Sequence, residues 1–149
     1  MAGTYDWSGT YGDVWAEEWR RTDRTLAPVN EALVARAAAG RGGRVRILDI
    51  GCGAGATSLA LGEALPEAEV TGIDLSPTLI AAARERAGSQ GRLRFEVGDA
   101  TSWTPDEACF DLIVSRHGIM FFDDPVAAFA HIGSLGRPGP RRPWRPAPR

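Results

Sequence analysis

The feature that most constrains this fold is the segment ILDIGCGAG at residues 47–55. A β-branched, apolar run bounded by glycine predicts a buried strand over residues 45–50. The alternating glycines Gly51, Gly53 and Gly55 let the chain turn sharply and let a ligand approach the backbone without meeting a Cβ atom. A helix that begins directly afterwards leaves free N–H groups at the loop. The segment therefore predicts a strand, a ligand-binding loop and a helix.

The rest of the chain continues this alternation of strands and helices. Apolar spacing predicts two helices between residues 11 and 39, separated at Pro28, and a helix over residues 56–65. Further strands are expected at residues 69–74, 93–97 and 110–115. The pairs Ser76-Pro77 and Asp124-Pro125 each combine a capping oxygen with a proline at the first helical position. This order predicts an α/β fold with a parallel sheet and helices on its faces.

Composition suggests three parts and limits the function. We expect a helical cap over residues 1–43, a ligand-binding domain over residues 44–135, and a disordered Arg/Pro-rich tail over residues 136–149. The tail has five prolines and five of the 17 arginines, and a natural partner-binding tail is the alternative. The rest of the chain has seven more acidic than basic residues, which disfavours a nucleic-acid partner.

The sequence also carries no sign of a membrane, an export signal or a metal. Neither an apolar run of about 18 residues nor a signal peptide is present, so we expect a cytoplasmic protein. Cys52 and Cys109 belong to no cysteine or histidine cluster, and we expect no metal and no disulfide framework.

Asp74 stands 21 residues beyond Gly53, at the end of the second expected strand. A carboxylate there can accept both hydroxyls of a ribose, which predicts a nucleoside cofactor. Gly51, Gly53, Ala56 and Asp74 also satisfy the dinucleotide-binding pattern, so a NAD-dependent oxidoreductase is one alternative. Asp49 opposes that alternative, because its charge repels a pyrophosphate and suits a cationic cofactor.

Four motifs resemble those of the class I S-adenosylmethionine-dependent methyltransferases, especially bacterial enzymes similar to those of ubiquinone and menaquinone synthesis. They are ILDIGCGAG (47–55), VTGIDLS (70–76), GDA (98–100) and FDLIVSRHGIMFFDDPVAAF (110–129), within a resemblance that covers residues 7–139. The resemblance implies a Rossmann-like sheet in the order 3-2-1-4 behind an N-terminal helical cap. Similar proteins continue beyond residue 139 with further strands, so the sheet is expected to be incomplete. Residues from Pro140 read like coding text in a shifted frame, which favours a frameshift or a truncation.

The resemblance also implies how S-adenosylmethionine is held. The glycines lie under its methionine part, Asp49 orders the loop or the amino group, and Asp74 binds the ribose. The resemblance implies that Asp99 and Ala100 flank the adenine and that Leu75 packs against it. It also implies that Ser115 lies near the methyl group and that Trp15 helps to cover the cofactor.

Several of these residues have structural alternatives. Asp49 can cap the loop, Asp99 can belong to a surface turn, and Trp15 can pack between helices. His117 is a candidate general base, although lining of the pocket is the preferred interpretation.

The predicted activity is methyl transfer to an oxygen, nitrogen or carbon atom of a small molecule. An inactive cofactor-binding fragment is the other alternative. The edge of the strand at residues 110–115 is expected to be exposed and available for self-association.

Overall fold

The structure, a computed structural model, describes residues 6–106 and 109–138. Strands and helices alternate through most of the chain, after two N-terminal helices. The elements are α1 (Thr10–Glu17), α2 (Trp19–Ala38), β1 (Arg46–Ile50), α3 (Ala56–Ala64), β2 (Glu69–Asp74), α4 (Pro77–Ala87), β3 (Leu93–Val97), β4 (Leu112–Val114) and α5 (Pro125–Ser134).

The four strands form one parallel sheet in the order β3-β2-β1-β4. The register pairs Ile47 of β1 with Val70 of β2 and with Leu112 of β4. The chain thus crosses from one side of β1 to the other between β3 and β4. In open α/β sheets such a reversal leaves a crevice outside the carboxyl ends of the strands, where ligands bind.

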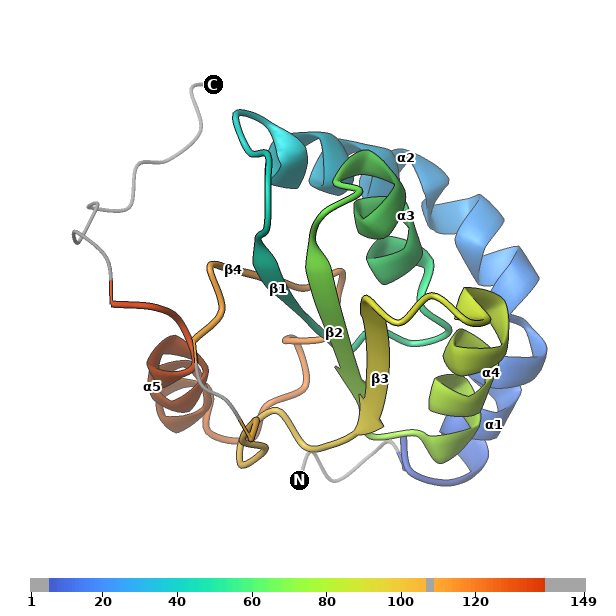
Figure 1. Cartoon of the computed structure of the whole chain (residues 1–149). Helices are drawn as coiled ribbons and strands as arrows, with labels where there is room; N and C mark the ends of the chain where they lie inside the picture. Colours follow the sequence, from blue (N-terminus) through green and yellow to red (C-terminus); the bar gives the residue numbers. More distant parts are fainter. Residues whose placement is uncertain (1–5, 107–108, 139–149) are drawn as a thin grey trace, which may run out of the picture.

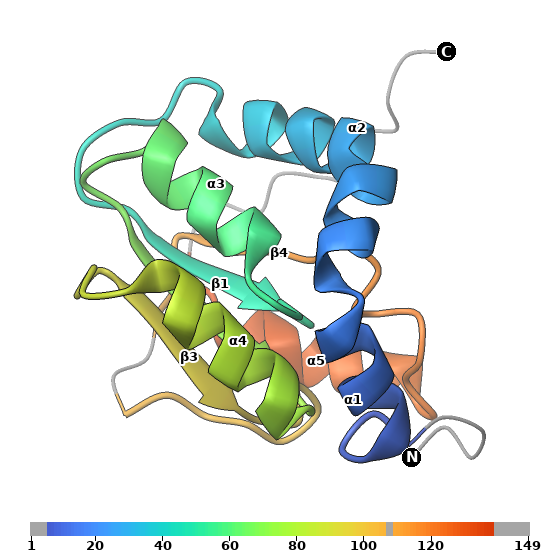
Figure 2. The ribbon, with the colours of Figure 1, turned by 90° about the vertical axis from the view of Figure 1, so that its right-hand side faces the viewer.

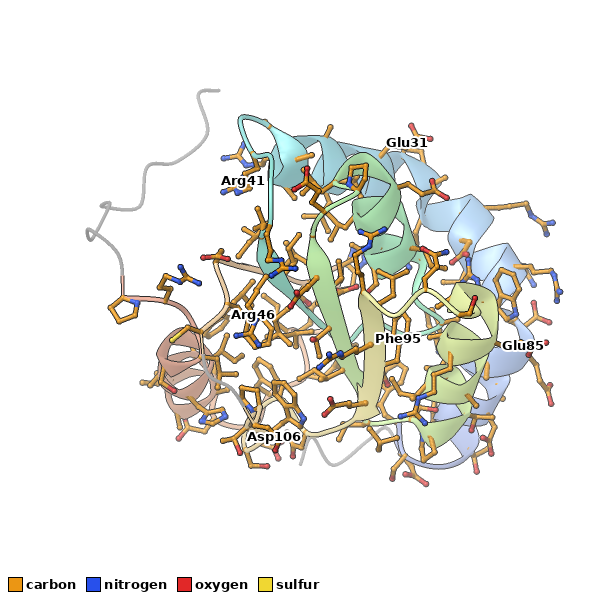
Figure 3. The ribbon with its side chains drawn as sticks, in the orientation of Figure 1. Glu31, Arg41, Arg46, Glu85, Phe95 and Asp106 are labelled. Atoms are coloured by element: carbon orange, nitrogen blue, oxygen red, sulfur yellow. The ribbon has the colours of Figure 1, made fainter. Side chains whose placement is uncertain are left out.

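Helices cover both faces of the sheet, so the fold has three layers. Figure 2 shows α3 and α4 in front of the strands and α5 behind them, and Figure 1 shows α2 running alongside α3. Ile47 faces a core shared with α3 and α4, whereas Leu48 and Ile50 face a second core that includes Ile132 of α5. Glu31 of α2 and Glu85 of α4 lie on the outer, exposed sides of their helices (Figure 3). These observations confirm the predicted α/β class and the strand order 3-2-1-4.

Two helix starts follow the predicted capping chemistry. The Ser76 hydroxyl accepts a hydrogen bond from the Leu79 amide at 3.2 Å, and Asp124 Oδ1 accepts one from the Ala127 amide at 3.0 Å. In each case a proline fills the first helical position, where no amide hydrogen is needed.

The predicted break at Pro28 is wrong, because Pro28 lies inside α2 and the helical region is instead divided at Glu18. Proline removes one amide donor from a helix, but packing can compensate for that loss. Here α2 lies against α3, and the Thr57 hydroxyl donates to Asn30 Oδ1 at 2.6 Å within the same contact.

The fourth strand and the start of the tail also differ from expectation. β4 covers only Leu112–Val114, not residues 110–115, because its ladder with β1 is limited to the three pairs at Ile47–Asp49. Gly136 forms a parallel bridge with Phe110, and the Arg137 amide donates to the Phe110 carbonyl at 2.8 Å. The ordered chain thus extends beyond the expected boundary at residue 135. The rest of the predicted tail, residues 139–149, lies outside the described residues.

None of the helices in the described part of the chain is both long enough and apolar enough to cross a membrane.

Candidate cofactor-binding site

The loop between β1 and α3 is built on glycine. Gly51, Gly53 and Gly55 all have positive φ angles, of 65°, 54° and 85°, which side chains rarely tolerate. A Cβ atom on Gly51 would lie 2.6 Å from the Gly118 Cα, so the loop after β4 packs directly on this glycine. At Gly53 a Cβ atom would meet nothing within 4 Å, so the backbone is open there. The loop can therefore receive a ligand closely at Gly53.

Asp74 ends β2 beside this loop. Its Oδ2 atom accepts a hydrogen bond from the Gly53 amide at 2.9 Å, and its Oδ1 atom accepts one from the Ser76 amide at 3.0 Å. Burial raises the pKa of Asp74, and the backbone amides oppose that rise by stabilising the carboxylate. The side chain thus fixes the loop and also lines the adjoining pocket.

Asp49 lies beneath the loop and is 1% exposed. Its Oδ2 atom accepts a hydrogen bond from the Ser58 hydroxyl at 2.7 Å, while Oδ1 has no hydrogen-bond partner among the described residues. Burial raises the pKa of Asp49 to about 7, the Ser58 hydrogen bond and the charge of Arg116 lower it, and the charge of Asp74 raises it. This is a buried carboxylate whose ionisation a nearby cation would favour.

Cys52 and Ser115 have structural roles in the loops. Burial raises the pKa of the Cys52 thiol well above its ordinary value, so it is protonated at neutral pH and a poor nucleophile. The Ser115 hydroxyl donates to the Ile50 carbonyl at 2.8 Å and accepts from the Gly118 amide at 3.0 Å. Ser115 thus ties the loop after β4 to the end of β1.

A pocket of about 1010 Å³ opens above these loops, at the carboxyl ends of the strands. It brings together eight of the eleven predicted site residues: Trp15, Gly51, Gly53, Asp74, Leu75, Asp99, Ala100 and His117. Asp49, Gly55 and Ser115 are not in its lining; they lie under or beside it. Its volume is at the upper end of the range for small-molecule sites, about 300–1,000 Å³.

The end of the pocket near β3 has one apolar and one acidic surface. Leu75 is 41% exposed and Ala100 is 8% exposed. Asp99 Oδ1 accepts hydrogen bonds from both the amide and the hydroxyl of Thr101, at 2.8 and 2.7 Å. Asp99 therefore does form the surface turn weighed as its alternative, and it lines the pocket as well.

The roof of the pocket contains residues that the sequence did not single out as ligands. Trp7, Trp19, Arg116 and Phe121 line it beside the predicted Trp15. The spacing of aromatic residues through the N-terminal segment could have indicated that they line the pocket. No local sequence pattern indicates that residue 121 lies close to residue 7. His117 has a φ angle of 68° and also lines this region.

Arg86 of α4 connects two parts of the pocket lining, helix α2 and the glycine loop. Its guanidinium donates to the Ala54 carbonyl at 2.6 Å and pairs with Asp23 of α2 at 2.7 Å. The same group lies 3.9 Å from the centre of the Trp19 ring, a cation–π contact. One side chain thus holds α2 against the glycine loop.

Known proteins resemble this chain in sequence. Residues 47–139 match a family described as a methyltransferase domain. The match spans more than half of the chain, and the chain therefore belongs to this family.

Individual relatives agree with that assignment. Trans-aconitate 2-methyltransferase of Streptomyces coelicolor is 48% identical over 74 residues, which cover 48% of this chain and 24% of the relative. Demethylmenaquinone methyltransferase of Deinococcus radiodurans is 34% identical over 97 residues, which cover 64% of this chain and 40% of the relative. The chain spans less than half the length of the curated relatives it matches.

A solved structure completes the comparison. Haemonchus contortus phosphoethanolamine N-methyltransferase 2, in complex with S-adenosylhomocysteine, has a TM-score of 0.68 and 29% identity, over 75% of this chain and 26% of that one. These findings confirm the predicted resemblance and support S-adenosylmethionine, rather than NAD, as the cofactor.

Proposed function

We propose that this chain binds S-adenosylmethionine in the pocket above the glycine loop and is part of a protein that methylates a small molecule. The observation that carries the proposal is the open backbone at Gly53, with Asp74 beside it and the buried Asp49 beneath. A cationic ligand suits this acidic surrounding, whereas a pyrophosphate is repelled by it. The family and the relatives named above support the same activity.

The residues present fit each part of the proposed ligand. Asp74 lies where it can accept ribose hydroxyls while keeping its backbone partners, because a carboxylate has about four acceptor positions. Leu75 and Ala100 offer apolar contact to adenine, and Asp99 an acceptor for its amino group. Asp49 would neutralise the positive charge of the methionine end from below the loop. We assign Ser115 to holding that loop, and Trp15 to covering the ligand.

S-adenosylmethionine supplies an electrophilic methyl group: a nucleophile of the acceptor bonds to the methyl carbon while the C–S bond breaks and its electron pair stays on sulfur. The role of the chain is then orientation, since an in-line approach is the main requirement. We assign His117 to the wall of the pocket. The proton that the nucleophile loses passes to water.

The second candidate function is cofactor binding without transfer. It is favoured by β4, which has three residues and only the Phe110–Gly136 bridge beyond it in the described ranges. In either case we propose a cytoplasmic location, as expected from the sequence.

Calorimetric titration of the whole chain with S-adenosylhomocysteine and, separately, with NAD tests the cofactor. We expect binding of the first alone, and binding of NAD alone would contradict the proposal. Release of S-adenosylhomocysteine from S-adenosylmethionine, measured with and without candidate acceptors, then separates the enzyme from the binding fragment.

A further inference from the structure

A second, smaller cavity lies at the other edge of the sheet, where the strands begin. Its volume is about 70 Å³, and its lining combines charged, hydroxyl and aromatic side chains: Arg46, Glu69, Thr71, Arg92, Arg94, Phe110. These residues lie just before β1, β2, β3 and β4 or within their first three residues, whereas the cofactor pocket opens at the carboxyl ends. None of the six lines the cofactor pocket. The cavity is therefore a separate site, which the proposed function does not use.

The strand register places the polar residues of this cavity on one face of the sheet. Arg46 pairs with Glu69 across β1 and β2, and Thr71 pairs with Arg94 across β2 and β3. Residues two apart along a strand share a face, so all four lie on the face of Leu48, which is the register partner of Thr71. Figure 3 shows Arg46 on the side of the strands away from α4. Three adjacent strands thus bring these side chains together.

Several hydrogen-bond donors in the cavity are available to a ligand. Among the described residues, the Arg94 side chain makes no hydrogen bond or ion pair, and the Thr71 hydroxyl has no hydrogen-bond partner. Arg92 donates from Nη1 to the Ala68 carbonyl at 3.2 Å, which occupies one of the five N–H groups of a guanidinium. Arg46 contributes charge instead, since its guanidinium lies 4.0 Å from Glu69.

The charge of the cavity favours an anion. In the described part of the chain, the lining holds three arginines and one acidic residue, Glu69, which also lies 3.7 Å from Arg44. Two carboxylates close in sequence to the lining have partners of their own. Asp111 pairs with Arg137 at 3.1 Å, and Glu96 accepts a hydrogen bond at 3.1 Å from the indole of the loop after β3. The positive charge of the lining is therefore not neutralised by these groups.

The size of the cavity limits the anion to a small one. About 10–15 Å³ of such volume accommodates one water molecule, so 70 Å³ holds about five to seven water-sized groups. A phosphate or sulfate ion is of this size, whereas a whole nucleotide is several times larger. Guanidinium groups match the oxygens of a phosphate, because their N–H groups form a planar fork.

We propose that the cavity at the amino ends of β1, β2 and β3 binds a small tetrahedral oxyanion, either free phosphate or the phosphate group of a larger molecule. Arg92, Arg94 and Thr71 donate hydrogen bonds to its oxygens, and Arg46 adds positive charge. The strands bring these groups together only in the folded chain, so the anion binds the folded state and stabilises it.

Thermal unfolding of the whole chain in inorganic phosphate, at an ionic strength held constant with sodium chloride, tests this proposal. We expect the midpoint to rise by about 3–6 °C at a phosphate concentration about ten times the Kd. Phosphate also stabilises proteins in general, because it is excluded from their surfaces. The informative quantity is therefore the difference between variants of the same charge.

Arg94→Gln removes a charge and a fork of donors, and it should need at least about tenfold more phosphate for the same rise. The matched control is Arg36→Gln, which removes an exposed arginine of α2 outside the cavity and should respond as the unaltered chain does. Thr71→Val, which exchanges the hydroxyl for a methyl group, is a second variant that should weaken the response. The midpoint of each variant in sodium chloride alone shows whether it is folded.

The same measurement with phenyl phosphate separates the two sources of the anion. A rise at lower concentrations of phenyl phosphate than of inorganic phosphate would assign the site to the phosphate group of a larger molecule, and the reverse order would assign it to the free ion. Equal responses to inorganic phosphate by Arg94→Gln, Thr71→Val and Arg36→Gln would overturn the proposal. So would a midpoint in the unaltered chain that does not differ between phosphate and sodium chloride.

Discussion

Replacement of Asp49 by asparagine should stabilise the protein at neutral pH and have less effect in acid. The pKa of this carboxyl rises from 3.8 to about 7 on folding, chiefly because the group is buried. The folded state therefore holds a proton that the unfolded chain releases between those pH values, so stability falls as pH rises from about 4 to about 7. At 1.36 kcal/mol per pH unit, the total loss is about 4 kcal/mol.

Asparagine keeps the shape of the side chain but cannot ionise, so the variant lacks this loss. Burial of its amide carries a separate penalty of about 1–3 kcal/mol that does not change with pH. The pH-dependent part of the difference is therefore the informative quantity. Urea unfolding at pH 4, 5.5, 7 and 8 should show the variant gaining about 4 kcal/mol relative to the unaltered chain across that range.

Asp106→Asn is the matched control, since Asp106 is an exposed carboxylate in the loop after β3. A difference between Asp49→Asn and the unaltered chain that stays constant from pH 4 to pH 8 would refute the reasoning. It would mean that the carboxyl is not desolvated in the folded state.

Three further predictions concern the cofactor and the sheet edge. Asp74→Ala should weaken binding of S-adenosylhomocysteine by more than about tenfold in calorimetry, because charge-assisted hydrogen bonds are lost, and unchanged affinity would remove Asp74 from the site. Asp99→Ala should weaken binding of S-adenosylhomocysteine more than binding of an analogue without the 6-amino group; equal losses would show that Asp99 does not read the adenine. Because β4 is an edge strand of the sheet, we expect self-association that increases with concentration in sedimentation velocity, and a monomer throughout would contradict this expectation.

The parts of the fold that follow local rules were predictable. Residues such as Gly51, Ser76 and Asp124 act through their own backbone conformation or through neighbours within a few residues, and the structure confirms the turns and caps expected of them. Pro28 was not predictable in this way, because its tolerance depends on how α2 packs against a helix far along the chain.

Some residues of the candidate site were likewise predictable from local sequence, and others were not. Asp74 and Asp99 were identifiable because Asp74 ends one strand and Asp99 follows another, at the same edge of the sheet. The contact between Trp7 and Phe121 joins residues from opposite ends of the described chain, and no periodicity signals it. The same holds for Arg116, whose position over the buried Asp49 depends on the pairing of β4 with β1.

The guanidinium of Arg86 has a consequence for how ligands exchange. Any movement that lifts α2 away from α4 and the glycine loop while Arg86 keeps its bond to the Ala54 carbonyl must separate this group from Asp23 and from the Trp19 ring at the same time. Contacts that break together raise the barrier to opening more than the same contacts broken one after another. Because Arg86 is not part of the pocket lining, the residence time of a ligand can change through this position while the atoms that touch the ligand stay the same.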